Sequence, residues 1–239
     1  MRQLVTRILR DLPRRPAGGG LLDPAGAPAG RRQPVADLVL LGNLTGGGGG
    51  GLAVFDCIAE IVAEPALRLT LLLGPQELHL RRFLVGACDG QRWLSEGGIA
   101  FLVATGIDAR LGAAPSRLRG EVAAVLGARR ALLDGMPPSL VIGNMVFSHG
   151  GGDAAVPIAA QGVDALVLGP ASGGPTRRDD GFWTVHAGPL MGLEAGPTGV
   201  IGLCSGAHFA QRLVALRVDI DGCLGLLEAT EAAGARELL

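Results

Sequence analysis

The stretch DLVLLGNLTGG, from Asp37 to Gly47, is an apolar run that stops abruptly at small and polar residues. Three further stretches are built in the same way: LTLLLGPQE at 69–77, MVFSHGG at 145–151 and WTVHAGPL at 183–190. A short apolar run that ends at glycine is typical of a buried strand that delivers side chains to a site. The sequence therefore predicts strand-to-loop junctions of this kind at four places.

The composition excludes several classes of chemistry. The 239 residues are 48% hydrophobic, which is enough for a substantial core in one large or two small domains. The net charge of −1 provides no overall field that would favour nucleic acid or a membrane as a partner. The chain has no lysine and no tyrosine, so Schiff-base chemistry, a Walker A lysine and a catalytic tyrosine are excluded.

The sequence also indicates where the protein works. No apolar run approaches the roughly 20 residues that span a bilayer, and the start, MRQLVTRILRDLPRRP, carries charges throughout. We expect a soluble cytoplasmic protein. The cysteines have no CxxC spacing and are expected to be buried free thiols: Cys57, Cys88, Cys204 and Cys223.

Three parts are predicted along the chain. Residues 1–34 contain seven arginines against two aspartates and are expected to form a basic N-terminal helix with a Gly/Pro-rich connection. Residues 35–221 are expected to form the main domain. Residues 222–239 include LLEATEAAGARELL, which predicts a C-terminal tail or short helix.

The main part predicts an α+β fold. Two βα units come first, and the strands that follow are expected to be mostly antiparallel, which favours a two-sheet β-sandwich flanked by helices. A hairpin is expected to turn at Gly143-Asn144. The other expected strands are 35–41, 67–73, 182–186, 200–204 and 213–218, and the expected helices are 52–63, 76–85, 93–105 and 115–133.

The order and spacing of the four junctions resemble those of the calcineurin-like metallophosphoesterases, in particular the bacterial serine/threonine protein phosphatases. WLSEGGIAFLVATG at 93–106 is similar to the family's W-L-x-N-G-G segment, and LLDGMPPSLVIGNMVFSHGG resembles its approach to F-V-H-A-G. GVIGLCSGAHFAQRLVAL resembles the closing I-D-T-G segment. The resemblance covers roughly residues 35–218 and implies an α-β-β-α sandwich, with its first strand possibly missing from this sequence.

The resemblance implies a site for two metal ions from which most ligands have been lost. In the family, two divalent cations about 3.5 Å apart clamp a phosphate while a metal-bound water attacks. At an effective dielectric constant of about 20 they repel by roughly 20 kcal/mol, which carboxylate ligands must offset. The motif G-D-x-x-D-R-G begins here at Gly42, so the bridging aspartate is replaced by Asn43. The second aspartate and the phosphate-binding arginine fall on Gly46 and Gly47.

The remaining motifs are degenerate as well. G-N-H-E becomes Gly74-Pro75-Gln76-Glu77, so Gln76 replaces the histidine that protonates the leaving group and only Glu77 keeps its type. His149 matches a metal-binding histidine. In G-H-T-P the ligand position falls on Gly188, whereas His186 matches a non-ligand histidine. The late aspartate of I-D-T-G falls on Cys204.

The opening G-D-x-H-G motif has no counterpart in this sequence. Residues 1–15 look like the helix that would follow it. Either this strand lies upstream of Met1 or the element has been lost, and the sequence leaves both alternatives open.

The surviving polar residues also have structural interpretations. Asn43 fits a turn residue that tolerates positive φ, and His186 fits a satisfied, partly buried histidine. His79 and His208 are expected on the surface or in helices, and Arg177 and Arg178 in a solvated turn beside two aspartates. The glycine run 46–51 lacks a following Lys-Ser/Thr and is expected to be a flexible spacer rather than a phosphate loop.

Three functional hypotheses follow. The leading one is a catalytically inactive pseudophosphatase that binds or scaffolds a phosphoprotein or another protein. The second is a weak metal-dependent phosphoesterase acting on phosphate monoesters, and the third is a drifted or truncated sequence without selected activity. The metal candidates Asn43, His149 and His186 and the catalytic candidates Gln76 and Glu77 are therefore vestigial, and we expect at most weakly bound Mn²⁺, Fe or Zn²⁺.

Overall fold

The computed structural model of the chain describes residues 1–12, 36–45, 51–108, 114–170, 177–188, 192–195, 199–204, 212–219, 224–230 and 234–237. Of residues 192–195, 204 and 234–237 only the backbone is described. The predicted Gly/Pro-rich connection, the glycines at 46–50, His208 and Cys223 lie outside these residues.

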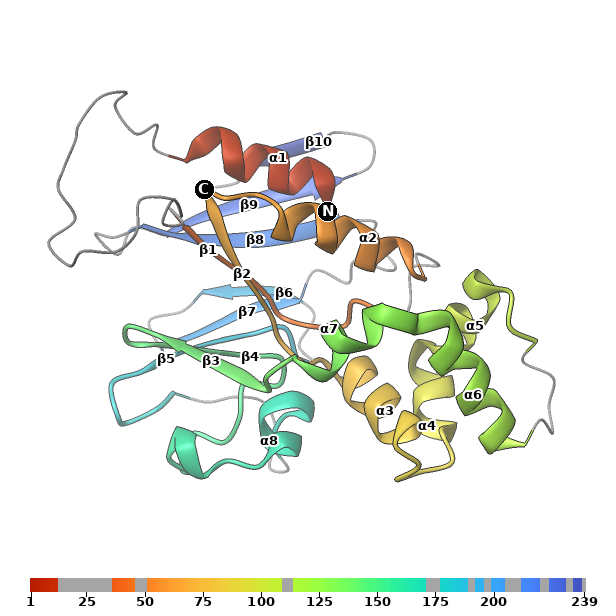
Figure 1. Cartoon of the computed structure of the whole chain (residues 1–239). Coiled ribbons are helices and arrows are strands. Elements are labelled where there is room, and N and C mark those ends of the chain that lie inside the picture. The colour runs from red at the N-terminus through yellow and green to blue at the C-terminus, as the bar shows by residue number, and fades with distance from the viewer. Residues whose placement is uncertain are drawn as a thin grey trace, which may run out of the picture.

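The described strands form three sheets (Figure 1). A parallel pair consists of β1 (Ala36–Leu40) and β2 (Leu67–Leu71). A five-stranded sheet has the order β3 (Ser139–Ile142), β4 (Met145–Ser148), β5 (Trp183–His186), β7 (Val200–Cys204), β6 (Gly192–Ala195). An antiparallel sheet has the order β10 (Gly234–Glu237), β9 (Leu224–Thr230), β8 (Arg212–Val218).

Helices precede, separate and flank these strands. In chain order they are α1 (Arg2–Asp11), α2 (Ala53–Val62), α3 (Pro75–Leu84), α4 (Gln91–Trp93), the π-helical turn η1 (Leu94–Gly98), α5 (Ile99–Thr105), α6 (Pro115–Leu126), the 3-10 turn η2 (Gly127–Arg129), α7 (Arg130–Asp134), the 3-10 turn η3 (Ile158–Ala160) and α8 (Val163–Leu168). The mixed α and β character predicted from the sequence is confirmed, and the packing of the sheets as one sandwich stays a prediction.

The five-stranded sheet is parallel at its centre and antiparallel at its margins. Strand β5 pairs in parallel with β4 and with β7, whereas the outer strands β3 and β6 run antiparallel to their neighbours. The predicted hairpin between β3 and β4 is confirmed. Gly143 has φ +57° and Asn144 has no positive φ, which fits a turn with glycine at its first central position.

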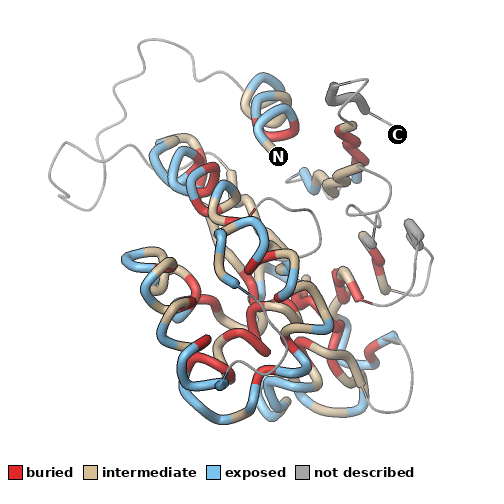
Figure 2. Tube along the Cα trace, turned by 90° about the vertical axis from the view of Figure 1, so that its right-hand side faces the viewer, coloured by how far each residue is buried: buried red, intermediate tan, exposed pale blue. Residues whose placement is uncertain are grey.

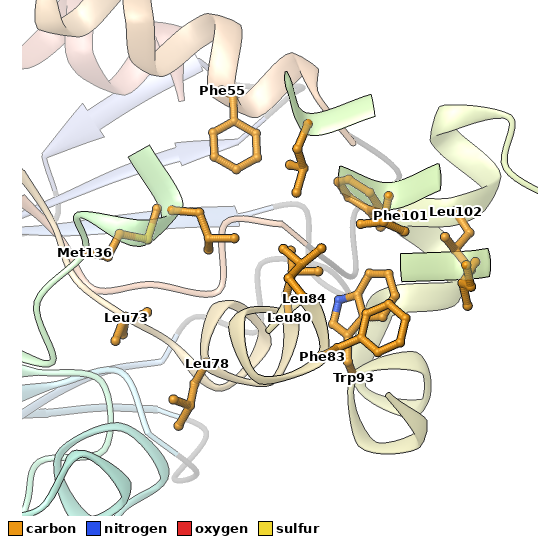
Figure 3. Packing of buried hydrophobic residues seen from close by; sticks show 14 of the residues in the cluster. Phe55, Leu73, Leu78, Leu80, Phe83, Leu84, Trp93, Phe101, Leu102 and Met136 are labelled. Carbon is orange, nitrogen blue, oxygen red and sulfur yellow. The ribbon is translucent and has the colours of Figure 1, made fainter. Parts of the chain in front are cut away.

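The main hydrophobic core is built around α3. Phe83 stacks on Trp93 with ring centroids 5.3 Å apart, and Phe101 meets the edge of Trp93 at 6.0 Å (Figure 3). Side chains from α2, α6 and α7 close the same cluster, including Phe55, Leu126 and Leu133. Figure 2 shows that buried stretches lie in the interior and exposed ones on the outer sides of the helices. The core therefore holds α3 and the loop that precedes it in a fixed place.

The N-terminal helix packs against the C-terminal sheet and against α2. In α1, Leu4 packs with Leu227 and Ala229 of β9, and Val5 packs with Cys57 and Ile61 of α2. The prediction that residues 222–239 form a tail or short helix is wrong, because 224–230 and 234–237 are strands paired with β8 and with each other. No helix among the described residues has the length and apolar character to span a bilayer.

Candidate functional site

The loop after β1 crosses the loop after β2 at two glycines. Gly42 has φ +91°, and a Cβ on it would lie 2.3 Å from the Gly74 backbone nitrogen. A Cβ on Gly74 would lie 2.3 Å from the Asn43 backbone nitrogen. Asn43 itself has φ +57°, so the expected turn residue with positive φ is confirmed. Only residues without side chains allow the two loops to touch in this way.

The Glu77 side chain holds the two crossing loops together. It is completely buried and accepts hydrogen bonds from the backbone amides of Asn43 (2.8 Å), Leu44 (2.7 Å), Thr45 (3.0 Å) and Gly74 (3.1 Å). The Thr45 hydroxyl donates to the same carboxylate at 3.0 Å. Since Glu77 is at the third position of α3, its bond to Gly74 also caps the helix. This carboxylate therefore fixes the loop conformation.

The side chain of Asn43 joins the second junction to the third. Its Oδ1 accepts from the Gln76 backbone amide at 3.2 Å, and its Nδ2 lies 3.3 Å from Nε2 of His149. The other ring nitrogen, Nδ1 of His149, lies 2.6 Å from the Leu41 carbonyl oxygen. A carbonyl can only accept, so Nδ1 donates and Nε2 accepts from the Asn43 amide. Both nitrogens of this imidazole are engaged.

His149 is buried and uncharged at neutral pH. Burial lowers the pKa of its imidazole below the usual value of 6.5. The Leu41 carbonyl and the charge of Glu77 oppose this shift but do not cancel it. The ring is therefore neutral, in the tautomer that its hydrogen bonds require.

The fourth junction adjoins His149 through the backbone. The Ala187 amide donates to the His149 carbonyl at 3.0 Å, and the Gly188 amide donates to Nδ1 of His186 at 3.2 Å. His186 is buried rather than only partly buried, with 2% of its surface exposed. A Cβ on Gly188 would lie 3.2 Å from the His149 carbonyl oxygen. Gly188, which the resemblance aligns with a metal ligand, thus lies directly beside His149.

Gln76 directs its side chain away from this cluster. Its Nε2 donates at 3.0 Å to the carbonyl oxygen of Glu96 in η1. A side-chain amide has no proton to release at neutral pH. The Gln76 amide also contacts η1 and not the loop after β4, which carries His149.

The four junctions found in the sequence thus meet in one place. Asn43, Gln76, Glu77 and His149 are linked by hydrogen bonds, and Gly188 adjoins them. Among the described residues, no three His, Cys, Asp or Glu side chains are grouped so that they could hold a metal ion. The roles of Thr45 and the Leu41 carbonyl were not predicted, because neither residue belongs to a ligand motif.

One expectation about the charged residues is wrong. Arg178 is not in a solvated turn but is buried, and its guanidinium donates to Asp180 and to the carbonyl oxygens of Asp153 and Val156. His79 lies in helix α3, one of its two expected placements, and its side chain is buried there. Comparison of the chain with family models, curated proteins and solved structures gives no match.

Proposed function

We propose that this chain is a catalytically inactive relative of the calcineurin-like metallophosphoesterases, with their α-β-β-α sandwich, and that it acts by binding another protein. Support comes from the meeting of Asn43, Gln76, His149 and Gly188 in one place. These positions come from four separate junctions whose order carries the resemblance. Neighbouring parallel strands bring their carboxyl ends together in many folds, so the order of the four junctions along the chain is what favours this family.

One observation argues against catalysis: the surviving polar groups satisfy one another. The lone pair on Nε2 of His149 accepts from the Asn43 amide, and the Asn43 carbonyl oxygen accepts from the Gln76 backbone. The Glu77 carboxylate is occupied by loop amides. In a two-metal site the corresponding groups must offer free lone pairs to the cations. Here hydrogen bonds among the residues themselves occupy that place.

The proton donor for a leaving group is missing too. Gln76 has the position of the family's acid, and its amide donates to the Glu96 carbonyl. Metal ions, an acid and a phosphate-binding cation act together in phosphoryl transfer, so loss of all three leaves little rate enhancement.

A binding role is compatible with the same network. Glu77 and Asn43 hold the crossing loops in one conformation, and a pre-organised surface loses less entropy when a partner binds. The proposed partner is a phosphoprotein or another protein.

Turnover of an aryl phosphate with added Mn²⁺ tests the proposal. We expect no rate above that of a His149→Ala variant purified in the same way, because no described group can activate water or protonate the leaving group. A rate that follows the protein through chromatography and disappears in His149→Ala would overturn it.

A further inference from the structure

A second polar cluster lies between α3 and η1. Three of its buried atoms have no hydrogen-bond partner: Oε1 of Gln76, Nε2 of His79 and Oε2 of Glu96. Buried polar atoms are nearly always paired in folded proteins. The side chains that carry these three atoms all adjoin Glu96, so one bound group could pair with all of them.

The three side chains are neighbours. Nε2 of His79 lies 3.3 Å from Oε2 of Glu96, and the His79 side chain is only 8% exposed. Gln76 is three residues before His79 on α3, so both side chains are on the same side of that helix. The Gln76 amide nitrogen already donates to the Glu96 carbonyl at 3.0 Å, which leaves Oε1 as its free atom.

The helical turn that carries Glu96 is distorted. Within η1, Glu96 has φ −98° and ψ 17°, and Gly97 has φ +128°, a value that favours glycine. These two residues form a kink between α4 and α5 rather than a regular helical turn. Arg92 donates to Oε1 of Glu96 at 2.7 Å, so the other carboxylate oxygen is the one that faces His79.

We propose that Nε2 of His79, Oε2 of Glu96 and Oε1 of Gln76 form a binding site for a divalent transition-metal ion, with zinc as the best fit. Zinc–nitrogen and zinc–oxygen bonds of about 2.0–2.2 Å in a tetrahedral site place two ligand atoms roughly 3.3–3.5 Å apart. The observed separation of 3.3 Å between the first two atoms agrees with this. A bound water completes the fourth position.

The chemistry of the three atoms favours a cation over a water molecule. In the tautomer that carries its proton on Nδ1, His79 is an acceptor at Nε2, and all three atoms are then acceptors. A water molecule has two protons to donate, whereas one cation satisfies all three atoms at once.

The arginines near the proposed metal site are paired with carboxylates, so their positive charges are partly neutralised. Arg92 is paired with Oε1 of Glu96, and Arg82 with Asp164. The bond from Arg92 orients the ligating carboxylate, a common arrangement around metal ligands. The proposed metal site is distinct from the cluster around Asn43 and His149, because Gln76 contacts Asn43 through its backbone amide and Glu96 through its side chain.

The test is calorimetric titration of the chelator-treated full-length protein with zinc chloride, supported by the visible spectrum of the Co²⁺ complex as a reporter of tetrahedral geometry. We expect one equivalent of zinc to bind. His79→Gln and Glu96→Gln should each weaken binding at least about tenfold. Glu121→Gln, at an exposed ion pair, is the neutral control.

A second variant separates this site from the phosphatase-like cluster. His149→Gln removes the imidazole of that cluster and should leave zinc binding as it is. Loss of binding in His149→Gln would overturn the proposal by placing the ion there. Absence of binding, or equal binding by all variants, would overturn it by showing no site or only adventitious zinc. Circular dichroism confirms that each variant is folded.

Discussion

Glu77 matches the glutamate of the G-N-H-E motif that its segment resembles, but it has a structural role that the motif does not reveal. Its carboxylate receives amides from both crossing loops and lies entirely out of solvent. A buried carboxylate is tolerated only when its oxygens are hydrogen-bonded, because desolvation of the charge is otherwise very costly. The identity of this residue is thus explained by the loop crossing alone.

Glu77→Gln should lower the free energy of unfolding by about 2–4 kcal/mol. The new NH₂ group would face backbone amides that are themselves donors, so at least one buried donor would lose its acceptor. Urea unfolding measures the change. As a control, Glu121→Gln, at a surface pair with Arg117, should change the free energy of unfolding by about 0.5 kcal/mol or less. An equally small effect of Glu77→Gln would show that this carboxylate does not hold the two loops together.

His149 should make stability depend on pH. Its pKa is lowered in the folded protein, so the unfolded chain takes up a proton first as the pH falls. The neutral ring therefore contributes its full stability above about pH 6.5, and this contribution is lost progressively as the pH falls towards the folded value. The loss is about 1.4 kcal/mol for each unit by which the pKa is lowered.

Urea unfolding at about pH 7.5 and about pH 5.5 tests this for the native protein and for His149→Gln. The native protein should lose more stability between the two conditions. His79 has a pKa lowered in the same direction, but it is present in both proteins and its effect cancels. Equal losses would show that His149 is not held neutral.

At the scale of elements, the apolar patterns predicted most of the described helices and strands. β1, β2, α2, α3 and the β3–β4 hairpin occur within one or two residues of their expected bounds. Each has a strong local signal, such as a short apolar run, helical spacing or a glycine turn. The meeting of the four junctions was predicted only through the resemblance, since no single motif determines it.

The C-terminal strands could not be predicted in the same way. LLEATEAAGARELL is rich in Leu, Glu and Ala, which favour helix when considered alone. In the structure, β9 is the central strand of its sheet, and its consecutive residues Leu226, Leu227, Glu228 and Ala229 are buried. Because residues on both faces are buried, the strand lacks the alternation that would reveal it. Tertiary pairing decides its conformation.

Leu4→Ala in α1 should lower the free energy of unfolding by about 2–4 kcal/mol. Leu4 is 8% exposed and packs with Leu227 and Ala229, so its truncation leaves a cavity between the helix and the sheet. Thermal or urea unfolding measures the loss. Thr6→Ala, at an exposed position of the same helix, serves as the control, and equal effects would show that α1 does not pack against β9.

At the scale of the whole molecule, introducing the ligands of the resembling family one by one would not by itself create a metal site. Nδ2 of Asn43 donates to His149, so a carboxylate at position 43 would face the lone pair on Nε2. The imidazole would have to change tautomer and abandon its bond to the Leu41 carbonyl, or become protonated. A charged imidazole cannot bind a metal ion. The first substitution toward the family motif therefore strengthens a hydrogen bond instead of building a metal site.

Asn43→Asp alone should therefore restore no phosphatase activity, measured as turnover of an aryl phosphate with added Mn²⁺. Residues that act as one catalytic unit are strongly non-additive, so partial repair is expected to give nothing. The combined variant should also fail, because the opening motif has no counterpart in this sequence and a histidine at 188 would crowd the His149 carbonyl. Its substitutions are Asn43→Asp, Gly46→Asp, Gly47→Arg, Pro75→Asn, Gln76→His and Gly188→His. Substantial activity from Asn43→Asp would mean that other residues replace the missing ligands, and that the protein is an enzyme disabled by one step.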